Sequence, residues 1–507
     1  MPFDHRLPSD VSLRARSPLP ERDPTLGVPL AQPAPPAGEP AHRLVVIGDS
    51  LSQGFQNLAV SNTSLSWPKI LADALGFPFR VPFFGGPCEC PGLPLNLEAM
   101  LRALEEAHGG RFLSLRPDAL LTFTRLMTLV DRYWDDGDGF HPPVQPEFNH
   151  NLAIYGWDLR DALSKDRALL QKQILDRPPR MHFYRPGVQD DGQIAALRVL
   201  AGPLDHEVTQ LSAAQALGAE GIDSLVVMLG ANNALMSIVT LGSPEWSGDG
   251  YDDPVAKDAY TVWRPTHFAA EYALLAGELK KVRARRVVLA TVPHVTIAPL
   301  ARGVGTKPTG SRYFPYYTRP WISDRDFDPG RDRYLTGDDA WAVDSAVDDY
   351  NDAIKDQVRS ARRQGLDWYL FDLCGLLDSV AYRRYQDPAA RPDGYEPYPL
   401  PDVLARLDPP PDTRFFVSDN GRRSQGGLIA LDGVHPTTVG YSIVAAEVLR
   451  VLAAAGVPEA QDAGIDFAAM LAADTLLCRP PLSLSMDLRV LGWFSELVDW
   501  AGALFRR

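Results

Sequence analysis

Short apolar runs alternating with amphipathic stretches constrain the fold of this chain more than any other feature of its sequence. Four runs rich in β-branched and aromatic residues occupy 44–47, 224–229, 286–292 and 368–373. Runs of this length, bounded by Gly, Pro or polar residues, predict buried strands. Apolar residues at helical spacing occupy 67–75, 268–284, 344–363 and 438–455. Because buried strands that alternate with helices form parallel sheets covered on both faces, the pattern predicts an α/β domain with a three-layer α/β/α, flavodoxin-like architecture.

The strand and helix pattern continues from residue 42 to 456, which predicts one domain there. The total of 507 residues is large for a single domain, so we expect long insertions within it. Residues 1–41 contain ten prolines in the first forty positions and no apolar block, which predicts a flexible leader. Residues 457–507 are predicted to form a C-terminal helical extension.

Five segments are too long to be ordinary connections between elements, at about 79–147, 178–195, 236–265, 300–340 and 380–425. Long loops in compact domains are usually functional or disordered, so these insertions either cap a site or face solvent. Stretches in and beside the insertions are rich in aromatic residues, for which three roles are open: lining a pocket, stacking on sugars, or filling the cores of the insertions. These residues include Trp134, Trp157, Trp246, Trp263, Tyr316, Tyr317 and Trp321.

Charge and cysteine content exclude several classes of protein. With 50 Lys+Arg against 64 Asp+Glu, the formal charge of -14 repels phosphate backbones and argues against a nucleic-acid partner. Four cysteines are too few for a disulfide scaffold. Cys88 and Cys90 form a C-x-C, but no second ligand pair stands at zinc spacing, so we expect no metal and no cofactor.

No apolar run reaches the roughly 18 residues that span a membrane, and the leader lacks the apolar segment of a secretory signal. We therefore expect a cytoplasmic protein without an integral membrane segment. Near the end of the chain, residues 484–505 carry apolar residues at helical intervals and predict an amphipathic helix. This helix packs on its own domain, on a sister subunit, or on a lipid surface, so self-association and peripheral membrane contact both stay open.

A serine stands where the first predicted strand ends. Ser50 follows Gly48 and Asp49, at the carboxyl end of the strand, where reactive groups of parallel sheets gather. A serine hydroxyl becomes a nucleophile only when a base takes its proton. Asp432 and His435 lie three residues apart in the loop before the last predicted helix, so one loop can present both. The sequence therefore predicts a catalytic Ser50, His435 and Asp432, with the carboxylate orienting the imidazole.

Acyl transfer to a serine also needs donors for the negative oxygen that develops on the substrate. Asn232 follows the strand at 224–229, at the same edge of the sheet as Ser50. Gly156, which lacks a Cβ, can bring a backbone N–H close to a substrate. Gly85 and Gly86 also follow an apolar run and compete with Gly156 for this role. Each such donor is worth roughly 3 to 4 kcal/mol in well-studied enzymes.

These segments together resemble the GDSL/SGNH hydrolase family. Residues 48–51 (GDSL) resemble the family's first block, 151–156 the second, 230–232 the third and 432–435 the last, in the family's order. The resemblance covers about half of the chain and leaves the insertions outside. Asn233 stands where the family commonly has Asp, which puts local hydrogen bonding in doubt more than the chemistry.

The resemblance implies the SGNH hydrolase fold and a serine hydrolase that cleaves carboxylic esters through an acyl-enzyme on Ser50, as an esterase or lipase. It implies an oxyanion hole made by the Ser50 N–H, the Gly156 N–H and the Asn232 amide. Lipid ester, acetylated sugar, thioester and polyester substrates all stay open. Two alternatives also remain: a flavodoxin-like protein whose loop 48–54 binds a phosphate or a cofactor, and a non-catalytic scaffold. The loop lacks both common phosphate-binding glycine patterns.

Overall fold

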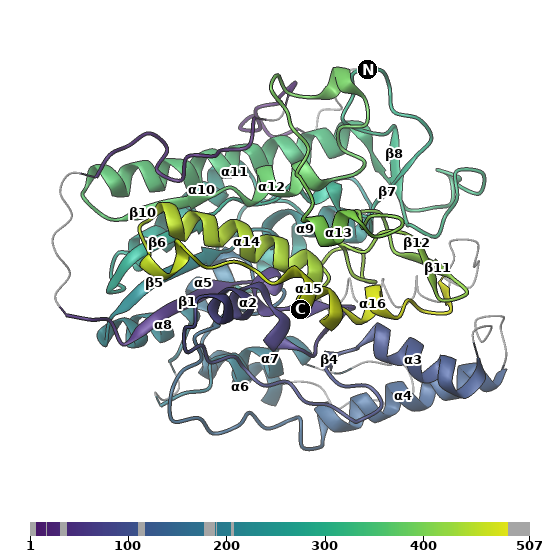
Figure 1. The fold of residues 1–507 in the computed structure, drawn as a ribbon, viewed down its shortest axis with the longest axis horizontal. Coiled ribbons are helices and arrows are strands. Elements are labelled where there is room, and N and C mark those ends of the chain that lie inside the picture. Colours follow the sequence, from purple (N-terminus) through teal and green to yellow (C-terminus); the bar gives the residue numbers. More distant parts are fainter. Residues whose placement is uncertain are drawn as a thin grey trace.

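The computed structural model describes residues 7–16, 18–30, 38–109, 117–176, 188, 190–203 and 207–484. At its centre lies a parallel sheet of four strands in the order β1 (His42–Gly48), β5 (Ile222–Met228), β6 (Ala284–Ala290) and β10 (Trp368–Phe371) (Figure 1). Each strand coincides with one predicted apolar run to within about two residues, and the predicted α/β class is confirmed. Strands β1, β5 and β6 begin two residues earlier than predicted, and β5, β6 and β10 end one or two residues earlier.

A further segment extends this sheet beyond β1. The amide of Val46 donates to the carbonyl of His150 (2.9 Å), and the amides of Leu152 and Ile154 donate to the carbonyls of Val46 and Gly48 (2.8 and 3.0 Å). Residues 150–154 therefore run beside the outer edge of β1, parallel to it. As a result, β1 is an interior strand, and its carboxyl end is enclosed from both sides.

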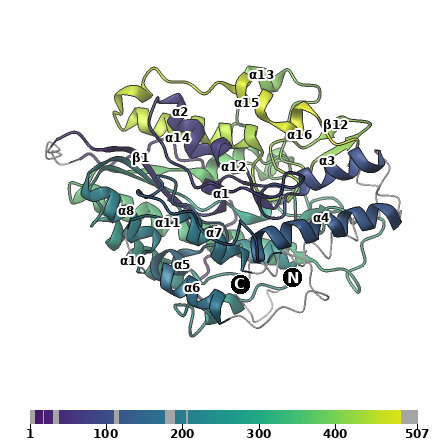
Figure 2. The same ribbon diagram turned by 90° about the horizontal axis from the view of Figure 1, so that it is seen from below.

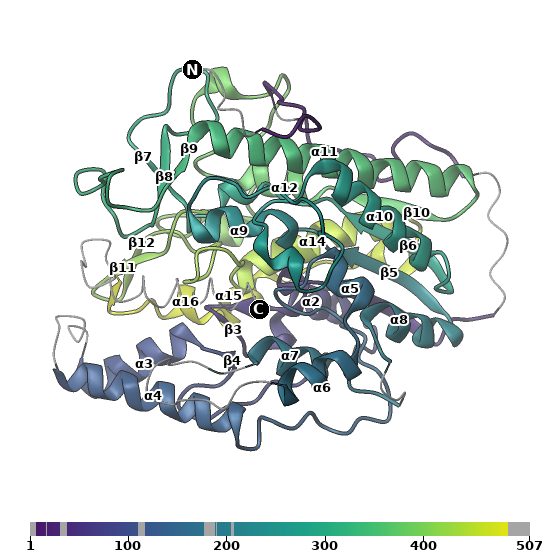
Figure 3. The ribbon, with the colours of Figure 1, turned by 180° about the vertical axis from the view of Figure 1, so that it is seen from behind.

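Helices cover both faces of the sheet, as a three-layer arrangement requires. Helices α2 (Trp67–Ala74) and α14 (Thr438–Ala454) pack on one face, where Leu44 and Val46 of β1 point (Figure 2). The opposite face, where Val45 and Ile47 point, is covered by α5 (Leu159–Ser164), α8 (Gln210–Ala219), α10 (Pro265–Leu279) and α11 (Gly337–Arg363) (Figure 3). Successive residues of a strand point to opposite faces, so the continuous apolar runs supply two cores at once.

All four predicted helices are present, with shifted ends. Helix α11 begins at Gly337 instead of 344, because the Thr336 side chain accepts the amide of Asp339 and the Asp339 carboxylate accepts in return. Helix α10 ends at Leu279 instead of 284, because β6 begins at Ala284. The helical periodicity of the sequence predicted where the helices lie. A capping pair set the first residue of α11, and the strand that follows α10 limited its last residue.

The predicted insertions contain short helices and strands joined by long irregular stretches. Segment 79–147 forms β4 (Leu93–Pro94), α3 (Leu97–His108) and α4 (Pro117–Asp135), and the two helices lie side by side (Figure 1). Segment 178–195 lies largely outside the described residues. The later insertions contain η2 (Ala256–Ala259), β7 (Arg302–Val304), β8 (Tyr316–Thr318), β9 (Leu335–Thr336), η4 (Pro388–Ala390), α13 (Asp402–Ala405), β11 (Val417–Asp419) and β12 (Arg422–Gln425).

The remaining short elements connect these parts. Around the start of the domain and between the main strands they are α1 (Ser50–Gln53), β2 (Phe55–Gln56), β3 (Ala59–Val60), η1 (Thr63–Leu65), α6 (Arg167–Leu175), α7 (Asp191–Val199), α9 (Asn232–Thr240), η3 (Val295–Ile297) and α12 (Leu373–Val380). The C-terminal extension contains η5 (Pro458–Ala460), α15 (Phe467–Ala473), α16 (Thr475–Cys478) and β13 (Ser483–Leu484), which pairs with β11.

The described part of the leader packs on the domain, which differs from the prediction of a flexible segment. Arg14 pairs with Asp349 (2.8 Å) and Asp352 (2.5 Å) on α11. Further along, the amide of Leu370 on β10 donates to the carbonyl of Pro24 (2.8 Å), so the leader covers the free edge of the sheet. Apolar side chains of the leader also contribute: Val11 is buried in the core, and Leu7 and Leu26 pack against it.

The predicted amphipathic helix at 484–505 lies outside the described residues, except for Leu484 at its start. Among the residues that the structure describes, no helix has both the length and the apolar character needed to cross a membrane.

Candidate functional site

Ser50, His435 and Asp432 lie in contact although 385 residues separate the serine from the histidine. The Ser50 Oγ is 2.8 Å from His435 Nε2, and His435 Nδ1 is 3.2 Å from the Asp432 Oδ2. All three side chains are buried. This is the geometry in which an imidazole takes a proton from a hydroxyl while a carboxylate holds the ring from behind.

Hydrogen bonds from the β2–β3 hairpin hold the two ends of the chain together. The amide of Leu58 donates to Asp432 Oδ2 (3.2 Å), and the amide of Leu431 donates to the side-chain oxygen of Asn57 (2.9 Å). From α14, the Tyr441 hydroxyl donates to the carbonyl of Phe55 (2.7 Å). The loop that carries the histidine is thus tied to the chain just after the serine, independently of the contact between Ser50 and His435.

The electrostatics of Asp432 suit an orienting carboxylate. Burial alone would raise its pKa, but the imidazole of His435 and the amides of His435 and Val434 outweigh burial and lower the pKa below its ordinary value. Both amides donate to Asp432 Oδ1 at 2.9 Å. Asp432 is therefore an anion at neutral pH, and its remaining oxygen faces the ring.

Asp49 is a second buried carboxylate beside the triad, and the sequence analysis assigned it no role. It caps α1 by accepting the amide of Leu51 (3.0 Å), and it is 1% exposed. Burial raises the pKa of Asp49 to about 7, against the lowering effect of that amide and of His435. The capping pattern of Asp before a short helix was visible in the sequence, but its burial was not.

The predicted oxyanion donors lie around Asn232, at the start of α9. The Asn232 side-chain amide donates to the carbonyl of Trp157 (2.8 Å), which leaves one of its two hydrogens available. Gly156 precedes Trp157 and has φ of 76°, a conformation that favours glycine. Neither the Gly156 nor the Ser50 amide hydrogen is accepted by any described residue. Two backbone donors and one side-chain donor are thus available near the serine.

An apolar cavity opens beside the serine. It encloses about 630 Å³ of empty space that is open to solvent, and Ser50, Asn232 and His435 line it. The rest of its lining is mainly aliphatic, from α9, η3, α12 and the loop before His435: Leu51, Leu235, Val295, Ile297, Leu377, Val380, Ile429 and Val434. A cavity of this size and character suits an acyl chain.

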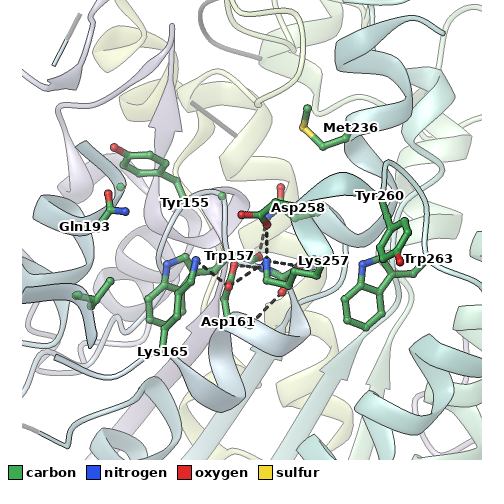
Figure 4. A pocket seen from close by; sticks show the side chains of 15 residues that line it. Tyr155, Trp157, Asp161, Lys165, Gln193, Met236, Lys257, Asp258, Tyr260 and Trp263 are labelled. Atoms are coloured by element: carbon green, nitrogen blue, oxygen red, sulfur yellow. Dashed lines mark hydrogen bonds and ion pairs between the residues drawn. The ribbon is translucent and has the colours of Figure 1, made fainter. Parts of the chain in front are cut away.

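A polar cavity of about 760 Å³ lies on the other side of Asn232. Gly156 and Asn232 both line it, and Asn232 lines the apolar cavity as well, so the Asn232 side chain stands at the boundary between the two cavities. Figure 4 shows Lys257 and Asp258 near its centre, with Trp157 on one side and Trp263 on the other (Figure 4). Ser50 itself lines only the apolar cavity.

The charged groups of the polar cavity are paired with one another. Lys257 Nζ lies 2.8 Å from Asp158, 3.1 Å from Asp161 and 3.0 Å from Asp258, and Lys165 lies 2.9 Å from Asp161. Burial alone would lower the pKa of Lys257, but the three carboxylates raise it well above its ordinary value. Lys257 is therefore a cation at neutral pH. Lys257 lies in the insertion at 236–265, and no pattern in that segment predicted a buried lysine.

His294, which the sequence analysis left out of the site, lines the apolar cavity. Its Nδ1 is 3.0 Å from Asp378 and its Nε2 is 3.2 Å from Asp348. Burial would lower the pKa of His294, but Asp378 and its other neighbours raise it well above its ordinary value. With carboxylates at both ring nitrogens, His294 has no nitrogen free to act on a substrate, and it stabilises the wall of the cavity.

Other candidates from the sequence lie elsewhere. Gly85 and Gly86 line neither cavity, and a Cβ on Gly86 would meet Pro91 and Gly92. The Cys90 thiol is buried and Cys88 is exposed, so they do not form a shared pair of ligands facing one point. Among the aromatic residues, Trp157 and Trp263 line the polar cavity, and Trp134 is fully buried with its indole N–H on the carbonyl of Gly92 (2.8 Å).

Comparison of the chain with known proteins gave no match to a protein-family model, a curated protein or a solved structure.

Proposed function

We propose that the chain is an ester hydrolase of the GDSL/SGNH type that acts through an acyl-enzyme on Ser50. The observation that carries the proposal is the contact of 2.8 Å between Ser50 Oγ and His435 Nε2, with Asp432 behind the ring. Ser50 and His435 are 385 residues apart in the sequence, and no single helix, strand or turn brings them into contact. Their contact at the carboxyl end of β1 supports a catalytic role.

The proposed reaction has two balanced steps. The Ser50 oxygen attacks the ester carbonyl while His435 accepts the hydroxyl proton, and the same proton then passes to the departing alcohol. A water next attacks the acyl-enzyme, His435 takes its proton, and the carboxylic acid leaves as Ser50 regains a hydrogen. The amides of Ser50 and Gly156 and the side chain of Asn232 stabilise the oxyanion in both steps.

The two cavities support a division of the substrate. An acyl chain fits the aliphatic cavity that Ser50 and His435 line. The alcohol fits the polar cavity, which the oxyanion donors Gly156 and Asn232 border. The proposed substrates are therefore esters that join an apolar acyl chain of moderate length to a hydrophilic alcohol, ahead of acetates, thioesters and polyesters.

The order of the sheet also supports the family assignment. With residues 150–154 beside β1, the two segments that resemble the first and second family blocks are neighbours in space, and β5 brings Asn232 to the same edge from the other side. The four blocks thus converge from four separate parts of the chain. We propose the SGNH hydrolase fold on this ground.

The alternative of a phosphate-binding loop at 48–54 is weaker. The Asp49 carboxylate already accepts the Leu51 amide at the start of α1, and α1 is only four residues long. A phosphate placed there would meet this carboxylate. No such conflict affects an ester carbonyl at Ser50.

The proposal is tested by labelling and turnover of the full chain. A fluorophosphonate probe should label Ser50, and Ser50→Ala should lose both the label and the hydrolysis of p-nitrophenyl octanoate, by about 10³-fold or more. Ser64→Ala, at an exposed position of η1, is the matched control and should keep both. Circular dichroism of each variant checks that it is folded. Unchanged turnover in a folded Ser50→Ala protein would refute the assignment.

A further inference from the structure

A third cavity, behind η3, is lined by four cations. It contains about 270 Å³ of empty space, open to solvent, between η3, the β7–β8 insertion and the turn after α12. Figure 3 shows β7 and β8 near α12. Lys307, Arg312, Arg383 and Arg384 line it, and its lining contains no carboxylate. The chain as a whole carries a formal charge of -14, so a purely basic cavity is not a consequence of its overall composition.

Arg384 and Arg312 line the buried side of this basic cavity and are 4% and 5% exposed. Arg384 pairs with Asp344 and lies 3.4 Å from Asp378, which also pairs with His294. Arg312 donates to the carbonyl of Arg14 (2.9 Å). The charge of Arg384 is therefore balanced by carboxylates.

Lys307 and Arg383 differ from Arg384, because their hydrogen bonds go to carbonyl oxygens and not to carboxylates. Lys307 Nζ donates to the carbonyls of Arg383 and Arg384, and Arg383 donates to the carbonyl of Ala298 (3.2 Å). No carboxylate among the described residues pairs with either side chain within 4.0 Å. Asp387, the closest opposing charge for Lys307, is engaged by the amides of Gly310 (2.7 Å) and Ala389 (2.9 Å). Two positive charges in this cavity are thus left without an ion-pair partner.

The titration of these groups agrees with an unbalanced positive potential. Burial, together with Arg384, Arg383 and Arg312, lowers the pKa of Lys307 to about 7. Burial lowers the pKa of Arg383 to about 10. An anion in the cavity would reverse both shifts, because it would favour the charged forms.

A neutral donor completes the lining. The Tyr317 hydroxyl accepts the amide of Phe314 (3.2 Å), and no described residue accepts its own hydrogen. Tyr317 is 4% exposed and lines the basic cavity. A buried hydroxyl hydrogen without an acceptor is unfavourable, and an anion beside it would supply one.

We propose that this basic cavity binds an oxyanion, a phosphate or sulfate group, held by Lys307, Arg383 and the Tyr317 hydroxyl. Guanidinium and ammonium groups make short, charge-assisted hydrogen bonds to such oxygens. The cavity is small, so it suits one tetrahedral group, either free or at the end of a small molecule. Ile297 lines both this cavity and the apolar one, so the two cavities adjoin at this side chain. The site does not depend on the proposed esterase function.

Calorimetric titration of the full chain with inorganic phosphate, against chloride at the same ionic strength, tests the site. We expect saturable binding of one phosphate, weakened at least about tenfold in a Lys307→Met, Arg383→Met double variant. Lys281→Met with Arg406→Met removes two exposed cations elsewhere and should bind as the parent does. Sulfate should compete with phosphate for the site. A titration with sn-glycerol 3-phosphate shows whether the site also binds a phosphate ester or only the free ion. Absence of saturation, or equal binding by both double variants, would overturn the proposal.

A second measurement needs no substitution. Acetylation of lysines by an N-hydroxysuccinimide ester at pH 7.5, read by mass spectrometry of peptides, compares the rate at the partly exposed Lys307 with and without phosphate. Phosphate should slow this modification at Lys307 by about tenfold and leave Lys281 unaffected. Equal rates at Lys307 with and without phosphate would contradict the site even if the double variant fails to fold.

Discussion

The apolar and the polar cavity meet at Asn232 and differ in what holds their walls together. Aliphatic side chains from α9, η3 and α12 line the first, and their packing needs no partner of matching charge. The second is held by Lys257 among three aspartates, where each charge depends on the others. The comparison teaches that substitutions in the polar cavity should first change stability, whereas substitutions in the apolar cavity should first change substrate choice.

The largest effect is expected for Lys257→Met. The change removes the shared partner of Asp158, Asp161 and Asp258 and leaves buried carboxylates without compensation, which costs about 3 to 5 kcal/mol of unfolding free energy. Urea denaturation measures it. Lys281→Met, which breaks an exposed pair with Glu278, should cost under about 1 kcal/mol. Similar losses in the two variants would mean that the polar cavity is not held by Lys257.

A pH-dependent effect should come from Asp191, at the edge of the polar cavity. Its carboxylate accepts the Tyr155 hydroxyl (2.6 Å), and burial raises its pKa from 3.8 to about 7. Between these values the unfolded chain has lost this proton while the folded chain keeps it, so stability falls as pH rises. Asp191→Asn should remove this part of the fall, up to roughly 4 kcal/mol between pH 4 and 7. Urea midpoints across this range measure it, and parallel curves for the two proteins would contradict it.

At the boundary, Asn232→Ala should reduce kcat by about 10² to 10³ for every ester, because an oxyanion donor acts on the carbonyl whatever the chain or the alcohol. Its Nδ2 also donates to the carbonyl of Trp157, so thermal denaturation should accompany the kinetics. A rise in KM with unchanged kcat would place Asn232 in substrate binding instead of oxyanion stabilisation.

The smallest effect is expected for Leu377→Trp, which tests directly whether the apolar cavity selects the acyl chain. Leu377 lines the apolar cavity and is partly exposed, so the larger ring can fill the space of an acyl chain. Hydrolysis of p-nitrophenyl octanoate should fall about 10- to 100-fold relative to the acetate. Leu274→Trp, on the exposed side of α10, should leave the ratio unchanged. An unchanged ratio of octanoate to acetate hydrolysis in Leu377→Trp would show that the acyl chain does not bind in this cavity.

The parts of the site that could be predicted are those marked by a sequence pattern of a few neighbouring residues. Ser50 after a strand, Asp432 and His435 in one loop, and Asn232 at a strand end were all found from the sequence. Their contacts, by contrast, depend on the β2–β3 hairpin, whose Asn57 and Leu58 hold the distant loop. Nothing in the sequence around Asn57 and Leu58 indicated this role.

The charged walls were not predictable for the same reason. Lys257 pairs with Asp158 across 99 residues, and Arg384 pairs with Asp344 across 40. The sequence around Lys257 is typical of an exposed turn. Its burial follows from the aspartates that surround it in the folded chain. The contacts of the leader were not predictable either, because its apolar residues Leu7, Val11 and Leu26 are isolated in the sequence and Arg14 pairs with α11 across 335 residues or more.

By itself, the sequence determined the parallel sheet, its main helices and the identity of the residues beside Ser50, because strand runs, helical periodicity and caps act over a few neighbouring positions. The tertiary structure decided which distant side chains meet, where the leader lies and which charges are buried. Those outcomes depend on the order and register of β1, β5, β6 and β10 and on how the insertions fold back over their carboxyl ends, and no stretch of the chain carries that information alone.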